Sequence, residues 1–330
     1  MEGYRSVMGT AGDRLLSERE LEFVIKSYRY LRLSIVALIV ALGTSMAWQI
    51  AITDRFNCME GSVSAYYYTA VHSLFIGALI AMGVSMIAIK GRSTVEDAYF
   101  NIAGFLAPVV AIVPTDPSGE LCSGKLPLSI HRELFVGNGM ASLLTGAGLT
   151  IGAVALILKR KAKKGKAPAV KFRAVFGAAT PGVAPAGLVG IGIVIAKLAG
   201  KSWLTSVHLV AAIGVFVSIW IVVMSLCSEG FHRFVHRRLA WQDEGSFKHR
   251  PPADIVKNLY RAVAASMPVG GVAVAGVTAL VSTDHWVLAL EAWEIALFGV
   301  FWAVQTGELW NVLPSAIPVH SATESAETTS

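Results

Sequence analysis

Long apolar stretches without charged residues dominate the pattern of the chain. Residues 33–53 and 137–158 contain no Asp, Glu, Lys or Arg. An α-helix needs about 20 mostly apolar residues to cross the ~30 Å hydrocarbon core of a bilayer, and both stretches are long enough. Neither shows the polar stripe at 3.6-residue spacing that is typical of helices on a soluble core. The pattern predicts eight membrane-spanning helices, at residues 33–53, 70–89, 98–114, 134–158, 174–198, 205–226, 262–281 and 286–306.

The composition supports an all-α polytopic bundle. Of the 330 residues, 54% are hydrophobic and only 15% are charged, whereas about a quarter of the residues in a soluble domain are charged. The net charge of +6 could point to nucleic acid. Lys and Arg gathered in cytoplasmic loops explain this charge better, so we expect a lipid bilayer and no nucleic acid as partner.

The basic residues also predict an orientation. The proposed inner segments, 1–32, 90–97, 159–173 and 227–261, hold 23 of the 28 Lys and Arg residues. Because basic loops stay in the cytoplasm, we expect a bacterial-type inner membrane protein with both termini cytoplasmic.

The segments outside the bundle (33–306) differ in character. Residues 1–32 predict a cytoplasmic amphipathic segment that lies on the membrane surface before the chain turns inward. The basic loops 159–173 and 227–261 are expected to bind anionic lipids of the inner leaflet. The C-terminal tail 307–330 lacks Lys and Arg and is rich in Ser and Thr, so we expect it to be cytoplasmic and disordered.

Proline and glycine gather in two predicted spans. The fifth contains Pro181 and Pro185, and the seventh contains Pro268, Gly270 and Gly271. The more common explanation is close helix packing with a kink. The alternative is a hinge or a discontinuous helix beside a substrate path.

Ionisable residues inside the spans are the strongest candidates for function, because charge is costly in lipid. His72, His208 and Glu291 fall at similar depths, roughly 5–8 Å inside the outer interface. Ser64, Tyr68 and His72 are spaced by four and share a helix face if the second span begins early enough. We therefore predict an outward-facing polar pocket, lined by Ser64, Tyr67, Tyr68, His72, His208, Glu291 and Glu294.

Three interpretations of these residues stay open. Each side chain could satisfy a local contact, or all could share one pocket. His72, His208 and Glu291 could instead bind a metal, since two histidines and a carboxylate can ligate zinc or iron. No catalytic residue is identified, because soluble-enzyme motifs are absent from the sequence.

Two cysteines lie in predicted outer loops. Cys58 follows the first span and Cys122 follows the third. The outer compartment permits disulfides, so we expect a bridge between them if their Cα atoms come within bonding distance.

The segment Ser62-Val-Ser-Ala-Tyr-Tyr-Tyr-Thr69 resembles the second span of an uncharacterised family of bacterial multi-pass membrane proteins. Further matching pieces begin at Asn101, His208 and Leu290, and together they touch about half of the spans. The resemblance implies a membrane bundle of unassigned activity whose recurring polar positions are Ser64, Tyr67, Asn101, His208 and Glu291. Family members often carry Arg where His72 stands and an acidic residue where Ser73 stands.

The layout is also loosely similar to the CREST superfamily of membrane hydrolases, whose members use Ser, Asp and intramembrane His around zinc. This chain lacks an intramembrane HxxxH pair. Two functions are thus expected. The favoured one is an integral membrane protein whose pocket binds or moves a small solute, ion or lipid. The alternative is a metal-dependent lipid amide or ester hydrolase, with zinc as its cofactor, so whether the protein is an enzyme stays open.

Overall fold

The computed structural model describes residues 18–52, 59–89, 91–115, 136, 138–139, 203–239, 252–282 and 284–310. Within these ranges the protein forms helices and no strands. The helices are α1 (Glu18–Ile52), η2 (Ser64–Tyr68), α2 (His72–Ala88), α3 (Thr94–Ile112), α6 (Trp203–Cys227), α7 (Glu229–Leu239), α8 (Asp254–Ala265), η4 (Ser266–Gly270), α9 (Gly271–Val281) and α10 (Trp286–Glu308).

Five described helical segments are long and apolar enough to cross a membrane. They are Phe23–Ile52, Val95–Ile112, Ser206–Cys227, Asp254–Val281 and Trp286–Glu308, and the shorter α2 is apolar too. Large apolar side chains on the outer surface fit a lipid environment, since Leu280 is 89% exposed and Val281 is 84% exposed. Six predicted spans therefore have a helical counterpart, and the other two, 134–158 and 174–198, lie almost wholly outside the described residues.

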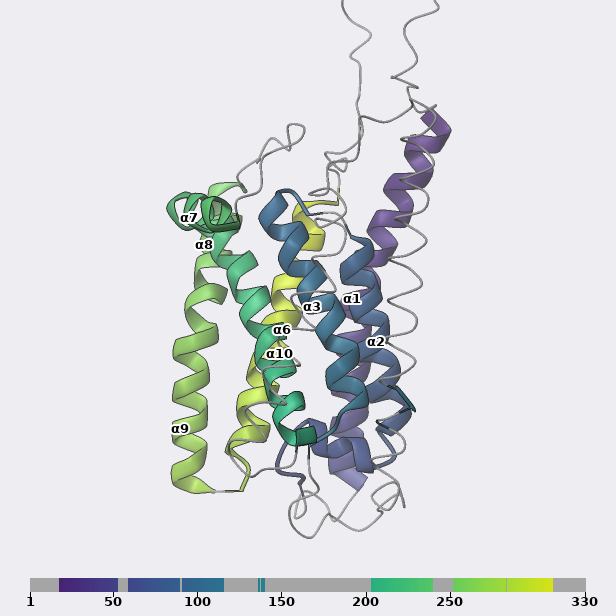
Figure 1. The fold of residues 1–330 in the computed structure, drawn as a ribbon, viewed down its shortest axis with the longest axis vertical. Helices are drawn as coiled ribbons and strands as arrows, with labels where there is room; N and C mark the ends of the chain where they lie inside the picture. The colour runs from purple at the N-terminus through teal and green to yellow at the C-terminus, as the bar shows by residue number, and fades with distance from the viewer. Residues whose placement is uncertain are drawn as a thin grey trace, which may run out of the picture.

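The long helices run up and down side by side (Figure 1), and their contacts close into a ring. Going around it, α1 contacts α2, α2 contacts α3, α3 contacts α6, α6 contacts α8, α8 contacts α10, and α10 returns to α1. Helix α9 stands outside this ring against α10. The predicted inner ends of the described spans gather at one end, which we call the Arg92 end, and their outer ends at the other, the η2 end. Which end faces the cytoplasm stays a prediction.

Helix α1 corrects one boundary. We expected an amphipathic segment up to residue 32 and then a turn into the membrane, but the helix is continuous from Glu18 to Ile52. No Gly or Pro occurs between residues 18 and 42, so nothing in the sequence interrupts the helical hydrogen bonds. In Figure 1 the first turns of α1 extend beyond the neighbouring helices.

The contacts of Arg32 hold α1 against α10 at the Arg92 end. Arg32 is only 1% exposed, and its Nη1 donates to Gln305 Oε1 at 2.6 Å. The guanidinium carbon lies 4.6 Å from the ring centre of Tyr28 and 5.5 Å from that of Trp302. The ring of Phe100 in α3 stacks on that of Trp302, with ring centres 5.1 Å apart. The partners of this buried cation are therefore an amide and aromatic faces rather than a carboxylate.

A charged network joins α3, α8 and α10 at the same end. Arg92 Nη1 lies 2.6 Å from Glu308 Oε1, and the Tyr260 hydroxyl donates to Glu308 Oε2 at 2.7 Å. The backbone amide of Arg92 donates to Glu96 Oε2 at 3.1 Å at the start of α3. Burial alone would lower the pKa of the Arg92 guanidinium, but the carboxylates of Glu96 and Glu308 raise it. The guanidinium therefore keeps its charge and links α3, α8 and α10.

Two glycines bring α2 and α3 into backbone contact. A Cβ on Gly83 would lie 2.5 Å from the carbonyl oxygen of Gly104, and a Cβ on Gly104 would lie 2.6 Å from that of Gly83. Real Cβ atoms do not approach a carbonyl so closely, so only glycine permits this crossing. Small residues at such contacts are the usual way for membrane helices to pack closely.

Pro268 lies in the π-helical turn η4, between α8 and α9. Proline has no amide hydrogen, so it leaves the carbonyl four residues earlier, that of Ala264, without its helical donor. Trp220 Nε1 of α6 donates to this oxygen at 2.9 Å, and Trp293 Nε1 of α10 donates to Ser266 O at 3.0 Å. Side chains from neighbouring helices thus satisfy the interrupted segment.

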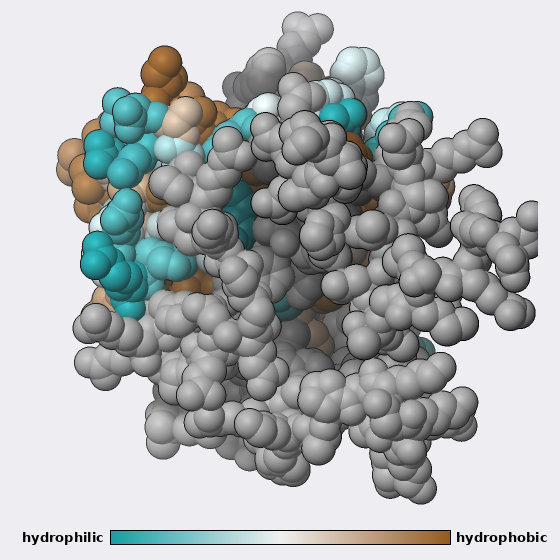
Figure 2. Space-filling view, turned by 90° about the horizontal axis from the view of Figure 1, so that it is seen from above, coloured by the Kyte–Doolittle hydropathy of each residue, from teal (hydrophilic) through white to brown (hydrophobic). Residues whose placement is uncertain are grey.

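Helix α7 lies across the Arg92 end, since Figure 1 shows it nearly end-on while α6 and α9 run along the long axis. The helix is amphipathic, with Arg233 exposed and Val235 buried. Seen from this end, hydrophilic and hydrophobic residues lie next to each other on the side where α7 and α8 lie (Figure 2). An amphipathic helix at this position suits a membrane interface.

The Gly83 contact predicts that Gly83→Ala lowers the thermal unfolding temperature of the detergent-purified protein. The expected loss is about 1–3 kcal/mol, because an extra methyl group in a packed interface forces the backbones apart. Gly77→Ala is the matched control in the same helix, since a Cβ there would meet nothing within 4 Å. Equal unfolding temperatures for the two variants would contradict the close approach.

Trp293→Phe tests the repair of the π-helical turn. The change removes the donor to Ser266 O but keeps an aromatic ring, so we expect a loss of about 0.6–1.7 kcal/mol, the range for hydrogen bonds within membranes. Trp48→Phe, at a side chain that is 68% exposed, is the control and should leave stability unchanged. A Trp293→Phe protein as stable as the wild type would refute this role of Trp293.

Candidate functional site

A cavity of about 80 Å³ lies inside the ring of helices. One water molecule needs about 10–15 Å³ by this measure, so the space is several times larger. Five long helices contribute to its wall, together with the residues that begin η2. The lining residues are Ile39, Leu42, Val63, Ser64, Phe75, Leu79, Met82, Met86, Ala107, Val110, His208, Ala212, Val215, Phe216, Glu291, Ile295 and Phe298.

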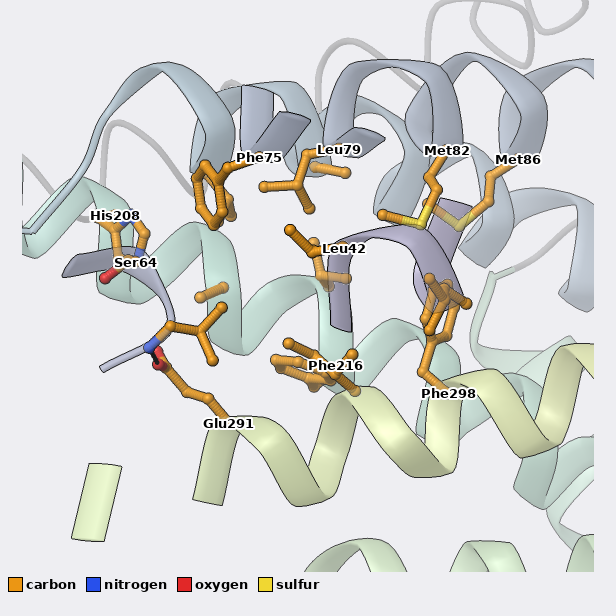
Figure 3. A pocket seen from close by; sticks show the side chains of 17 residues that line it. Leu42, Ser64, Phe75, Leu79, Met82, Met86, His208, Phe216, Glu291 and Phe298 are labelled. Atoms are coloured by element: carbon orange, nitrogen blue, oxygen red, sulfur yellow. Dashed lines mark hydrogen bonds between the residues drawn. The ribbon is translucent and has the colours of Figure 1, made fainter. Parts of the chain in front are cut away.

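The cavity is polar at one end and apolar along the rest of its length. Ser64, His208 and Glu291 gather at the η2 end, whereas Met86 and Phe298 lie at the opposite end (Figure 3). Glu291 and Phe298 are seven residues apart on α10, which corresponds to roughly 10 Å along the helix axis. This wall therefore fits a molecule with one polar group and an apolar chain.

Glu291 connects α10 to the start of η2. Its Oε2 accepts a hydrogen bond from the backbone amide of Val63 at 2.6 Å. A second link lies next to it, where the amide of Leu288 donates to Gly61 O at 3.0 Å. The first amides of a helix have no partner within the helix, so the carboxylate acts as a cap supplied by a distant segment. The backbone amide of Ser64 is a second donor to this carboxylate, and the side chain still lines the cavity.

His208 connects α6 to the end of α3. Its Nδ1 lies 2.5 Å from the carbonyl oxygen of Val113, the C-cap residue that follows α3. A carbonyl only accepts, so Nδ1 carries the hydrogen. His208 also lines the cavity, and the carbonyl of Val110 is a second backbone acceptor beside its ring. The hydrogen bond to Val113 uses Nδ1, which leaves Nε2 available to a molecule inside.

Ser64 completes the polar end through a chain of hydroxyl groups. Its Oγ lies 2.8 Å from Thr115 Oγ1 and 3.1 Å from Ser62 Oγ. The Tyr68 hydroxyl donates to Thr115 O at 3.0 Å. These bonds fix η2 to the segment that follows α3, so Ser64 is held in place beside His208.

The other predicted pocket residues lie elsewhere. Tyr68 is buried with its hydroxyl on Thr115, and the Tyr67 ring packs edge-on against that of His72 at 4.3 Å. His72 Nδ1 bonds the carbonyl of Tyr67 at 2.7 Å. Glu294 is turned toward α9, since a Cβ on Gly271 would lie 3.0 Å from its Oε1. None of these four residues lines the described cavity.

The shared helix face that we expected for Ser64, Tyr68 and His72 does not form. Ser64–Tyr68 is a separate 3-10 helix, and α2 begins only at His72. Thr69, with φ −113° and ψ −175°, is extended and separates the two helices. The early start of the second span on which this expectation depended is therefore wrong.

The three side chains considered for a metal are not brought together. Among the described residues, no group of three His, Cys, Asp or Glu side chains could hold a metal ion. His208 and Glu291 share the cavity wall, whereas His72 packs on Tyr67. The proposed disulfide partners Cys58 and Cys122 lie outside the described residues, and Cys227 is a free, buried cysteine.

The apolar wall of the cavity and the role of Thr115 at its polar end were not predicted from the sequence. Phe75, Leu79, Met82 and Met86 recur along one face of α2 at spacings of three and four, a signal that was present in the sequence. In a membrane span nearly every residue is apolar, so this periodicity does not separate a cavity face from a lipid face.

The cap on η2 predicts different effects for two substitutions of Glu291. Glu291→Gln keeps an acceptor for the Val63 amide and should preserve stability, whereas Glu291→Leu should cost about 1–3 kcal/mol because a buried amide loses its partner. Glu294→Leu, one turn away, is the control, since its Oε2 is buried without a hydrogen-bond partner among the described residues. Thermal unfolding in detergent measures all three. A Glu291→Leu protein as stable as Glu294→Leu would rule out the cap.

No family model matches the chain, and neither the curated proteins nor the solved structures give a match. The function therefore has to be inferred from the helices and the cavity themselves.

Proposed function

We propose that the protein is an integral membrane protein that binds an amphiphilic molecule in the cavity at its centre. The polar group of the ligand sits beside Ser64, His208 and Glu291, and its apolar chain extends between α1, α2, α6 and α10. The observation that carries this proposal is the separation of polar and apolar lining residues along one cavity. The sequence alone left a solute, an ion or a lipid as the ligand. The long apolar wall favours the lipid-like ligand, since a free ion would leave that wall without a role.

The apolar wall supports a chain rather than a compact solute. Leu79, Met82, Met86 and Phe298 all line the cavity beyond the polar end. Burying an apolar chain gains about 25 cal/mol for each Å² removed from water. Methionine side chains are flexible and adapt to chains of different shape, which favours a wall that accepts a lipid-like tail.

The membrane setting forms the second part of the proposal. We place the η2 end on the outer side and the Arg92 end on the cytoplasmic side, in the order that the basic segments predict. The exposed Arg233 of α7, at the Arg92 end, supports contact with anionic lipid headgroups. The basic loop 159–173, the other proposed contact, lies outside the described residues.

The metal-dependent hydrolase alternative gains no support from this site. Such an enzyme needs protein ligands that meet around one ion and leave a position open for water. His72 is separated from His208 and Glu291, and the described residues offer no other metal-binding group.

Filling the cavity tests the proposal. Ala212→Phe places a large side chain into the lining of α6, so it should reduce binding at least about tenfold, an effect of ~1.4 kcal/mol. The probe is dodecanol with a photoreactive diazirine in its chain, crosslinked to the full-length protein in lipid nanodiscs and quantified by peptide mass spectrometry. Labelling is expected on α2 and α6 and should be lost in the variant.

Ile213→Phe is the matched control on the same helix. Ile213 is 52% exposed on the outer surface, so the change adds the same ring outside the cavity and should leave labelling of the lining residues intact. Labelling that falls only on outward-facing residues, or that survives Ala212→Phe, would reject the binding cavity.

A further inference from the structure

We infer that the cavity selects amphiphiles whose polar group donates hydrogen bonds, namely an alcohol or a protonated amine, and discriminates against phosphate and carboxylate headgroups. This inference rests on the proposed function, because it assigns a head-group chemistry to the same cavity. It follows from which polar atoms at this end already form hydrogen bonds within the protein and which can still form one with a ligand.

The remaining nitrogen of His208 is an acceptor. Nδ1–H is committed to Val113 O at 2.5 Å, and in a neutral imidazole the second nitrogen then carries a lone pair and no hydrogen. Nε2 can therefore receive a hydrogen bond from an O–H or N–H group inside the cavity. The carbonyl of Val113 fixes this tautomer, since it accepts from Nδ1 in the absence of any ligand.

The Glu291 carboxylate adds further acceptor capacity. Two backbone amides of the chain, those of Val63 and Ser64, donate to it, and the Val63 amide does so at Oε2. An ionised carboxylate accepts hydrogen bonds at both oxygens and donates none. A ligand ammonium group beside the second oxygen would form a charge-assisted hydrogen bond, which is roughly twice as strong as one between neutral groups.

The described part of the cavity wall carries no group that compensates a negative charge. None of the described residues that line the cavity is Lys or Arg. The cations Arg32 and Arg92 belong to the opposite end of the bundle, where Gln305 and Glu308 bind them. A phosphate at the polar end would lose its hydration next to Glu291 without gaining a cation, and burial of an unpaired charge is strongly unfavourable.

The hydroxyl groups at the polar end do not change this preference. Ser64 Oγ and Thr115 Oγ1 are bonded to each other at 2.8 Å, and Ser64 also bonds Ser62. A hydroxyl can turn to donate or accept, so it accommodates the ligand group that His208 and Glu291 select.

Three probes with the same chain separate the head groups: dodecanol, dodecylammonium and dodecyl phosphate. Each competes with the diazirine-bearing dodecanol for the full-length protein in nanodiscs of neutral lipid, and concentrations are corrected for partition into protein-free nanodiscs. We expect dodecanol and dodecylammonium to displace the label at concentrations at least tenfold lower than dodecyl phosphate.

Glu291→Gln tests the charge at the polar end, because the amide keeps an acceptor for Val63 and removes the carboxylate. The ratio of dodecylammonium affinity to dodecanol affinity should fall about tenfold. A merely structural role of Glu291 would lower both affinities together and leave the ratio as it is, which would overturn its part in head-group selection. Ile213→Phe, outside the cavity, should show the wild-type ratio.

The outcomes distinguish this inference from the proposed function. If dodecyl phosphate competes as well as the other two probes, and Ala212→Phe abolishes all three, the cavity binds amphiphiles and the head-group inference is wrong. If none of the probes distinguishes the wild-type protein from Ala212→Phe, the binding cavity itself is wrong. The expected ranking, lost in Ala212→Phe, supports both.

Discussion

A backbone amide or carbonyl inside a bilayer finds no water to bond, so the protein has to supply every partner itself. This constraint accounts for the helical character of the described residues and for the detail at each interruption. Where Pro268 removes a donor, Trp220 of α6 provides the replacement, and Trp293 of α10 donates to Ser266 O in the same turn. Where η2 starts, Glu291 accepts from Val63, and where α3 ends, His208 donates to Val113. These four side chains therefore act where a helix is interrupted, begins or ends.

The same constraint explains why the polar end of the cavity lies at the η2 end. Each capping side chain has more hydrogen-bonding capacity than the backbone group it satisfies, and the remainder faces the space between the helices. His208 uses one of its two ring nitrogens on Val113. His208 therefore has a structural role, as a partner of the α3 backbone, and also lines the cavity. The ring of helices keeps this residual capacity away from lipid, where it would be costly.

The sequence predicted the helices well and the site only partly. Absence of charge over about 20 residues sets a span on physical grounds, so α6 and α10 lie close to the expected ranges. Depth estimates identified His208 and Glu291, because depth follows from the rise per residue. They failed for His72, since rotation about the helix axis and the break at Thr69 depend on contacts far apart in the sequence. The turn expected after residue 32 was wrong because Arg32 finds partners on α10, more than 270 residues away, at Gln305.

Helix α1 is 35 residues long, which corresponds to about 52 Å and exceeds the ~30 Å of hydrocarbon. It runs without a break from exposed turns at Phe23 and Tyr30 to Ile39 and Leu42 in the cavity wall. No break interrupts this helix, so a tilt imposed on its projecting end reaches those two side chains with no joint in between. Membrane thickness, which governs the tilt of an overlong helix, is in this way mechanically connected to the width of the cavity.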